Sequence, residues 1–182
     1  GEIYPQWQSI RSIKDDRGAI THFVAVFSDI TSIKHSEREL AHLAHYDALT
    51  GLPNRPAFDR ALGNAIASAA AGRHQHCLLY IDLDRFKPIN DRAGHAAGDA
   101  LLRQAAQTIR GSCRSQDLAA RIGGDEFAVL LLDCPAASGK AIADKIVRAV
   151  GALLFDWAGQ TYQVGASIGV TVITAAPAST LG

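Results

Sequence analysis

Residues Arg121–Leu132 have the sequence RIGGDEFAVLLL, and the expected sheet can be built outward from them. Two adjacent glycines stand between β-prone segments. Because glycine takes positive φ without steric cost, the pattern predicts a β-hairpin with the glycines in its turn. The turn would hold Asp125 and Glu126 near its tip, where Gly123 and Gly124 leave room for a large anion. Carboxylates beside such an anion favour a divalent cation such as magnesium, which binds hard oxygen ligands and substrate phosphates.

Segments on both sides of this hairpin predict a mixed α and β domain. Cys77–Asp84 is an apolar run that ends in acidic residues, as in a buried strand. Residues 86–99 are dense in polar groups and predict a loop or a short helix. Apolar patterns predict the other elements, namely helices at 57–71, 100–110 and 137–154, and strands at 118–122, 127–133, 155–164 and 166–173. Their order indicates an α+β fold with helices on one face of a partly antiparallel sheet.

The first 46 residues have a different pattern. Residues 4–13 and 20–27 alternate apolar and polar side chains around a short turn, which predicts a β-hairpin that is marginal in water on its own. A helix over 32–46, capped by Thr31 or Ser32, would carry a narrow apolar side typical of a helix that pairs with its own copy. We therefore expect three parts: residues 1–30 as a hairpin, 31–46 as a linker helix and 47–182 as the α+β domain.

Two acidic clusters are candidate catalytic groups. Asp82 and Asp84 end the central strand, and Asp125 and Glu126 lie at the hairpin turn. Either pair alone is equally consistent with solvated carboxylates. Neighbouring strand ends can bring the pairs together, and Asp82 with Asp125 would then bind two magnesium ions. Such a site suits in-line attack at phosphorus, because the metals neutralise charge on the phosphate oxygens and lower the pKa of an attacking hydroxyl.

Asn90 and Asp99 follow the central strand and are candidate nucleobase ligands. Guanine presents two adjacent donors, N1–H and N2–H, and a carboxylate can accept both, whereas adenine lacks this paired face. We expect the segment after the strand to bring the Asp99 carboxylate and the Asn90 amide to the base. The alternative is local capping and turn formation, which Asn and Asp also favour.

Composition restricts the function classes. The 182 residues contain 18 basic and 18 acidic side chains, which argues against a broad electrostatic surface for nucleic acid. The cysteines, Cys77, Cys113 and Cys134, lack CxxC spacing and are expected as reduced thiols. No apolar run is long enough to span a bilayer. We therefore expect no nucleic-acid partner, no membrane contact within these residues and a cytoplasmic location. Both ends suggest a piece of a longer protein.

Gly123–Phe127, GGDEF, is the signature of the GGDEF family of diguanylate cyclases, which this sequence resembles. Other segments resemble family motifs in family order: Asp47–Arg55 (DALTGLPNR), Asp82–Asp91 (DLDRFKPIND), Gly94–Asp99 (GHAAGD) and Ser167–Val170 (SIGV). The resemblance covers about residues 47–174. It implies a ferredoxin-like, palm-type nucleotide cyclase sheet with helices packed on it. Asp29–Thr31 likewise resembles the end of a PAS sensor domain, which leads into a signalling helix.

The resemblance also implies an activity and residue roles. Two GTP molecules would condense into cyclic di-GMP and two pyrophosphates, with one GTP held by each protomer of a homodimer. Two Mg²⁺ ions per active site, replaceable by Mn²⁺, would be held by Asp82, the Leu83 carbonyl and Asp125. Glu126 would assist at the metal or the hydroxyl. The other implied contacts are to guanine from Asn90 and Asp99, and to phosphate from the backbone amides around Arg85 and Phe86.

Arg114 and Asp117 form an Arg-x-x-Asp pattern that ends five residues before the next glycine pair begins. In the family this spacing marks an inhibitory site that binds the product, cyclic di-GMP, and Lys145 or Arg148 would add a basic contact. The alternative for such a pattern is a surface ion pair, which contributes little to stability.

Two other functions stay open from the sequence. A non-catalytic regulator would bind GTP or cyclic di-GMP and control a further domain, for example an EAL phosphodiesterase, but it has no need of both acidic clusters. A polymerase-like enzyme would share the carboxylates, but the balanced charge and the lack of an aromatic and basic stripe count against it. Family members continue beyond the SIGV strand into a basic segment that contacts the triphosphate. We therefore expect weaker phosphate binding from these 182 residues alone.

Overall fold

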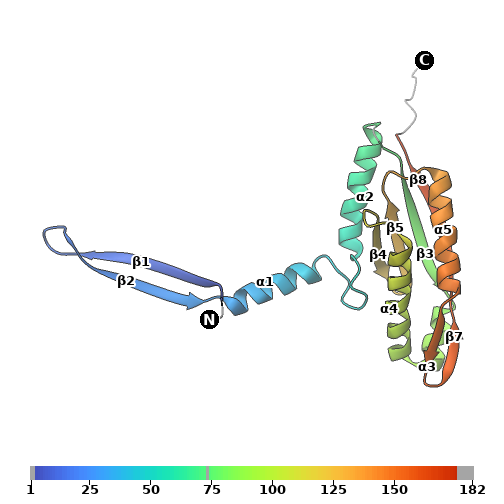
Figure 1. Ribbon diagram of the computed structural model, residues 1–182, viewed down its shortest axis with the longest axis horizontal. Helices are drawn as coiled ribbons and strands as arrows, with labels where there is room; N and C mark the ends of the chain where they lie inside the picture. The colour runs from blue at the N-terminus through green and yellow to red at the C-terminus, as the bar shows by residue number, and fades with distance from the viewer. Residues whose placement is uncertain (1–2, 73, 176–182) are drawn as a thin grey trace, which may run out of the picture. The chain divides into compact units, whose positions relative to one another are not determined.

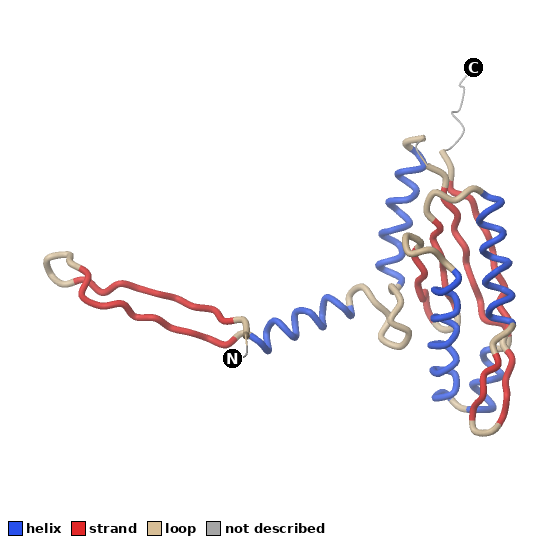
Figure 2. The backbone as a smooth tube through the Cα atoms, in the orientation of Figure 1, coloured by secondary structure: helices blue, strands red, loops and turns tan. Residues whose placement is uncertain are grey.

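The structure, a computed structural model, describes residues 3–72 and 74–175. Figure 1 shows the order of its helices and strands, and Figure 2 shows the same backbone coloured by secondary structure. The chain divides into two compact units, residues 1–43 and 44–182, which are described separately. None of the described helices is long and apolar enough to cross a bilayer.

The first unit is a β-hairpin followed by a helix: β1 (Gln6–Lys14), β2 (Ile20–Asp29) and α1 (Thr31–Leu43). The strands pair antiparallel, with a register shift next to the turn. Every side chain described in this unit is exposed or half-buried, and even Trp7 and Phe27 expose more than half of their surface. The hairpin therefore encloses no core of its own.

The start of α1 is capped from the preceding strand. The Asp29 carboxylate accepts hydrogen bonds from the backbone N–H and the hydroxyl of Thr31, at 2.8 and 2.6 Å. Thr31 is already helical, so the prediction that Thr31 or Ser32 caps the helix was wrong by one or two positions. The helix also ends at Leu43, earlier than the expected Tyr46.

The described part of the second unit contains four helices and six strands: α2 (Arg55–Ala70), β3 (His76–Asp84), α3 (Phe86–Ala93), α4 (His95–Ser112), β4 (Leu118–Gly123), β5 (Glu126–Leu131), α5 (Ala136–Gly151), β6 (Leu154–Trp157), β7 (Gln160–Gln163) and β8 (Gly165–Ile173). Four strands form one sheet in the order β4-β5-β3-β8, while β6 and β7 pair separately. All pairs in the sheet are antiparallel, rather than only some of them.

Helices cover both faces of this sheet (Figure 1). Side chains alternate along the strands, so the buried side chains of β5 divide between two cores. Phe127, Val129 and Leu131 belong to the main core with α4 and α5, whereas Ala128 and Leu130 pack with α2. The prediction of helices on one face was therefore wrong. Periodicity identifies the apolar side of a helix, but it does not show which face of the sheet that side covers.

The segment after β3 is more helical than the sequence predicts. α3 ends at Ala93 and α4 begins at His95, so Asp99 lies on a helix rather than in a loop. Gly94 separates the two helices with a φ of 84°, a conformation that favours glycine. Its N–H donates to the Asn90 carbonyl at 2.9 Å. Most of the polar residues that suggested a loop lie on the exposed sides of α3 and of the first turn of α4.

Candidate active site

The carboxyl end of β3 lies against the turn between β4 and β5. Asp82 is directly opposite Glu126 in the antiparallel pairing of β3 with β5. One residue further along, the Leu83 N–H donates to the Asp125 carbonyl at 3.3 Å. Antiparallel pairing therefore brings the two acidic clusters next to each other, although they are far apart in the sequence.

The turn itself consists of Gly124 and Asp125. Gly123 is the last residue of β4 and pairs with Glu126. Only the second glycine has a positive φ, of 51°, so the prediction that both glycines form the turn was wrong by one residue. A Cβ on either glycine would meet no atom within 4 Å. Both positions therefore leave open space beside the backbone.

Negative charge is concentrated around Asp82. Desolvation raises the pKa of its carboxyl, and the carboxylates of Asp125, Asp84 and Glu126 raise it further. A divalent cation would relieve this repulsion, so the donor set fits Mg²⁺. Among the described residues, no three His, Cys, Asp or Glu side chains form a ready-made metal cage. Proteins usually bind Mg²⁺ through only one or two carboxylates, and substrate phosphates complete its coordination, so such a cage is not required.

Asp84 has a different environment from Asp82. Its Oδ1 accepts a hydrogen bond from the Ser167 hydroxyl of β8 at 2.8 Å. A Cβ on Gly165 would lie 2.7 Å from its Oδ2, so this glycine leaves the space that the Asp84 carboxylate occupies. Asp84 thus joins β3 to β8. Asp82 is left as the available carboxylate at this strand end.

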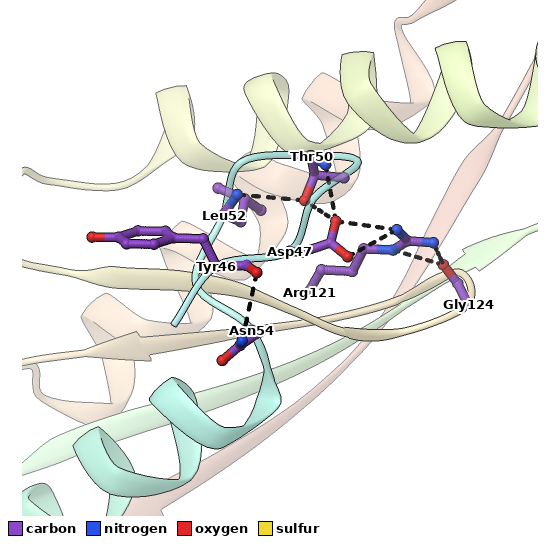
Figure 3. Close-up of polar contacts among 7 residues, drawn as sticks. All are labelled: Tyr46, Asp47, Thr50, Leu52, Asn54, Arg121 and Gly124. Atoms are coloured by element: carbon purple, nitrogen blue, oxygen red, sulfur yellow. Dashed lines mark hydrogen bonds and ion pairs between the residues drawn. The ribbon is translucent and has the colours of Figure 1, made fainter. Parts of the chain in front are cut away.

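Arg121 connects the turn to the loop before α2 (Figure 3). Its Nε and Nη2 donate to the Gly124 carbonyl at 3.0 and 2.8 Å. Its Nη1 lies 3.1 and 3.2 Å from the two carboxylate oxygens of Asp47. Desolvation would raise the pKa of Asp47, but hydrogen bonds from Thr50 and the Arg121 guanidinium outweigh it and lower that pKa. The turn that carries Asp125 is therefore fixed by a charged group on the adjacent strand.

Reasoning from the sequence assigned no role to Arg121 or Asp47, although both lie in segments that it singled out. The two residues are 74 positions apart. An ion pair between a distant loop and a strand leaves no periodic pattern in the sequence. The only available signal was that Arg121 and Asp47 each lie within a family motif or the stretch around it.

Arg85 and Phe86, the expected phosphate contacts, follow β3 directly. Arg85 has a left-handed backbone with a φ of 63°, and α3 begins at Phe86. The Arg85 side chain makes no capping hydrogen bond to this helix. The first N–H groups of α3 therefore lie beside the carboxyl end of β3 and favour an anion.

Asn90 and Asp99, the expected guanine ligands, lie on α3 and α4. Gly98 brings these helices together, because a Cβ there would lie 1.8 Å from Oδ1 of Asn90. That oxygen is buried and has no hydrogen-bond partner among the described residues. A buried acceptor without a partner is costly, which fits a group that meets a ligand. Asp99, the neighbour of Gly98, is exposed.

Arg114 and Asp117 lie between α4 and β4 and have unequal environments. Asp117 is only 4% exposed, and its carboxylate accepts hydrogen bonds from the N–H groups of Arg114 and Leu132 at 2.9 and 3.3 Å. The Arg114 side chain is exposed. Lys145 donates to the Ser112 carbonyl at 3.0 Å, at the end of α4. Asp117 therefore holds the turn, and Arg114 is the member of the pair that faces solvent.

A groove of about 420 Å³ lies between α2 and the β4–β5 side of the sheet, toward the start of β3. Its lining includes Ala65, Ser68, His76, Leu118 and Leu130. None of the expected catalytic, metal or nucleotide ligands lines this groove. The candidate active site is therefore the open strand end at Asp82, away from this groove.

Comparisons with known proteins identify a family for the second unit. The family described as "Diguanylate cyclase, GGDEF domain" matches residues 44–181. The chain is 43% identical over 173 residues to the probable diguanylate cyclase DgcE of Escherichia coli K12, a match that covers 95% of this chain and 16% of that protein. It is 47% identical over 143 residues to the diguanylate cyclase TpbB of Pseudomonas aeruginosa UCBPP-PA14, covering 77% of this chain and 32% of that protein. The chain thus spans about a third or less of these relatives.

A solved structure shows the same fold. The coiled coil and GGDEF domain of DgcB from Caulobacter crescentus, in complex with c-di-GMP, matches with a TM-score of 0.72 at 29% identity, over 79% of this chain and 76% of that one. The predicted fold class is confirmed, as an α+β domain with an antiparallel sheet and packed helices, preceded by a hairpin and a helix. The matched region contains both acidic clusters, so this chain belongs to the family of GGDEF diguanylate cyclase domains.

Proposed function

We propose that this chain is the catalytic domain of a diguanylate cyclase, which condenses two GTP molecules into cyclic di-GMP and two pyrophosphates. The pairing of Asp82 with Glu126 is the observation that supports this most, because it places two acidic clusters at one open strand end. The first N–H groups of α3 lie beside them and suit a phosphate. A domain that only bound nucleotide would have no need of both clusters.

Each residue of the site has a proposed role. Asp82, the Leu83 carbonyl and Asp125 would hold two Mg²⁺ ions, and Mn²⁺ could replace them. Bound Mg²⁺ supplies charge neutralisation at phosphate and lowers the pKa of an attacking hydroxyl. Glu126 would orient the metal or the hydroxyl. The substrate contacts would be backbone amides around Arg85 and Phe86 for phosphate, and Asn90 and Asp99 for guanine.

The reaction would take place between two copies of the chain. Each copy would hold one GTP, and the 3′-hydroxyl of each GTP would attack the α-phosphate of the other. A symmetric reaction of this kind depends on how closely two half-sites approach. α1 carries exposed apolar side chains, including Ile33 and Leu40, that would pair with a second copy. The first unit would be the end of a PAS domain and its signalling helix.

Product inhibition would act through Arg114. Its exposed guanidinium is suited to the phosphates of cyclic di-GMP. Asp117 would hold the turn in shape, with its carboxylate already bound to two N–H groups.

Incubation with GTP and Mg²⁺, followed by chromatography of the products, tests this function. We expect cyclic di-GMP from the wild-type protein, no product after the metal is chelated, and no product from Asp125→Ala. Asp144→Ala, which removes an exposed carboxylate on α5, should keep the wild-type rate. Undiminished product from Asp125→Ala would contradict the proposal. Tight binding of GTP or cyclic di-GMP without turnover, measured by calorimetry, would instead support a regulatory module that controls a partner domain such as an EAL phosphodiesterase.

A further inference from the structure

Tyr80 lies on the central strand, two residues before Asp82, and contacts the candidate active site. Its hydroxyl donates a hydrogen bond to Oε2 of Glu126, with an oxygen–oxygen distance of 3.0 Å. We propose that Tyr80 is a positioning residue that holds the Glu126 carboxylate in the orientation needed for metal and substrate. This inference rests on the proposed function, because it assigns Glu126 to the reaction.

The strand register leaves the Tyr80 ring free to reach Glu126. Tyr80 is opposite Ala128 on β5 and opposite Gly169 on β8. Neither neighbour has a large side chain or a polar one. Glu126 is the diagonal neighbour on β5, at a separation that a long side chain can bridge. The small residues on both sides therefore let the ring lean along the sheet toward the carboxylate.

The charges around Glu126 explain why a donor is needed there. Asp82 is directly opposite, and Asp125 precedes Glu126 in the chain. Without a partner, the Glu126 side chain would turn away from these carboxylates into solvent. A hydroxyl is suited to hold it because it donates without adding charge.

The bond uses one oxygen of Glu126 and leaves the other available. Hydrogen bonds from the outer side of a metal-binding carboxylate fix its orientation, and their removal typically lowers metal affinity or activity by about 10- to 100-fold. Tyr80 is 43% exposed, so it contributes little to the core. A phenylalanine would keep its packing and remove only the donor.

The test compares Tyr80→Phe with the wild-type protein. Mn²⁺ affinity is measured by electron paramagnetic resonance in the presence of 3′-deoxy-GTP, which binds but has no hydroxyl to react. We expect about ten-fold weaker Mn²⁺ binding or more in Tyr80→Phe, and a lower kcat with little change in the KM for GTP. Tyr162→Phe is the matched control, because its hydroxyl contacts Gln160 on the β6–β7 hairpin. It should match the wild type in both measurements.

A double-mutant cycle identifies the route of the effect. In a Glu126→Ala background, Tyr80→Phe should cause no further loss of Mn²⁺ affinity, because the acceptor is gone. Equal affinities of wild type and Tyr80→Phe, or a full additional loss in the Glu126→Ala background, would overturn the role of Tyr80. If Tyr80→Phe binds Mn²⁺ more weakly than the wild type but the wild type makes no cyclic di-GMP, the proposed function is overturned and the positioning of Glu126 by Tyr80 stands.

Discussion

Arg121 is the single residue whose side chain holds the β4–β5 turn in place, through contacts to Gly124 and Asp47. A two-residue turn with open space beside it has few contacts to hold it. The guanidinium donates to the Gly124 carbonyl and to Asp47 at the same time through a rigid, planar fork of donors, a geometry that the point charge of a lysine ammonium does not reproduce. The side chains of Arg121 and Asp47 are only 14% and 24% exposed. Their attraction is therefore less screened than that of a surface ion pair.

Replacing Arg121 should loosen the turn and lower stability. We expect Arg121→Ala to reduce the free energy of unfolding by about 2 kcal/mol, because it removes hydrogen bonds to a charged group and leaves Asp47 without its cation. Urea denaturation measures this difference. Arg103→Ala, on the exposed side of α4, is the control and should change stability by less than about 0.5 kcal/mol. Equal losses in both variants would contradict the role given to Arg121.

This stabilisation should depend on pH in a definite direction. The folded-state pKa of Asp47 is lower than its usual value. Its contribution is therefore present above the pKa of the unfolded carboxyl, and it is lost as the pH falls through the folded-state pKa. The stability difference between wild type and Arg121→Ala should be constant near neutral pH and should shrink in acid. A difference that grew as the pH fell would contradict the assignment.

Mutations of Arg114 and Asp117 should have different effects, although the two residues belong to one motif. Asp117→Ala removes a buried acceptor from two N–H groups and should reduce the free energy of unfolding by about 2 kcal/mol. Arg114→Ala should change it by less than about 0.5 kcal/mol and should weaken inhibition by cyclic di-GMP. Thermal unfolding and a product titration measure the two effects. Unchanged inhibition in Arg114→Ala would contradict the proposed product site.

At the scale of elements, the contact between α3 and α4 decides where Asn90 lies. The two helices meet at a glycine, and the nearest atom to a Cβ there is the end of the Asn90 side chain rather than the backbone. A methyl group at this position would therefore displace the Asn90 side chain, whose Oδ1 and Cγ would lie 1.8 and 2.7 Å from it, instead of separating the helices. We therefore expect a methyl group at Gly98 to affect ligand binding more than folding.

Gly98→Ala should accordingly weaken GTP binding and leave stability nearly unchanged. Displacing Asn90 from guanine should cost about ten-fold in GTP affinity, the equivalent of one hydrogen bond of about 1.4 kcal/mol. Calorimetry with GTP and Ca²⁺ measures the affinity. Gly111→Ala on the same helix is the matched control, because its Cβ would meet nothing within 4 Å. It should keep the affinity and could gain up to about 1 kcal/mol of helix stability. Equal GTP affinity in both variants would contradict the placement of Asn90.

In the whole molecule, the two units differ in whether a core of buried apolar side chains stabilises them. Both clusters of buried apolar residues lie in the unit from residue 44 onward. The hairpin and α1 expose nearly all of their described side chains. An isolated two-stranded hairpin is marginally stable in water. The stability of the chain therefore resides in the second unit.

A truncated chain of residues 44–182 should fold with nearly the stability of the whole chain. We expect the urea midpoints of the two proteins to agree, because no core residue is removed. Residues 1–43 alone should lack a cooperative transition. Circular dichroism measures both. Truncation should also lower cyclase activity, because α1 is the proposed pairing helix. A large loss of stability on truncation would contradict the independence of the second unit.

Local sequence was sufficient for the central features of this protein. The apolar run before Asp82 and the pattern around Gly124 predict the two strands that meet at the site, because strand formation and turn formation depend on neighbouring residues. The order of elements also predicts the α+β class. The motifs led to the family, since each one combines residue types with a spacing that chance rarely reproduces.

Contacts between distant segments required the tertiary structure. Helices cover both faces of the sheet because side chains on alternate strand positions point in opposite directions, and the sequence does not say which helix fills which side. The Arg121–Asp47 pair, the Tyr80–Glu126 hydrogen bond and the approach of Gly98 to Asn90 all join residues that have no local reason to meet. Each depends on strand register or helix packing, because only the folded chain brings their side chains within reach of one another.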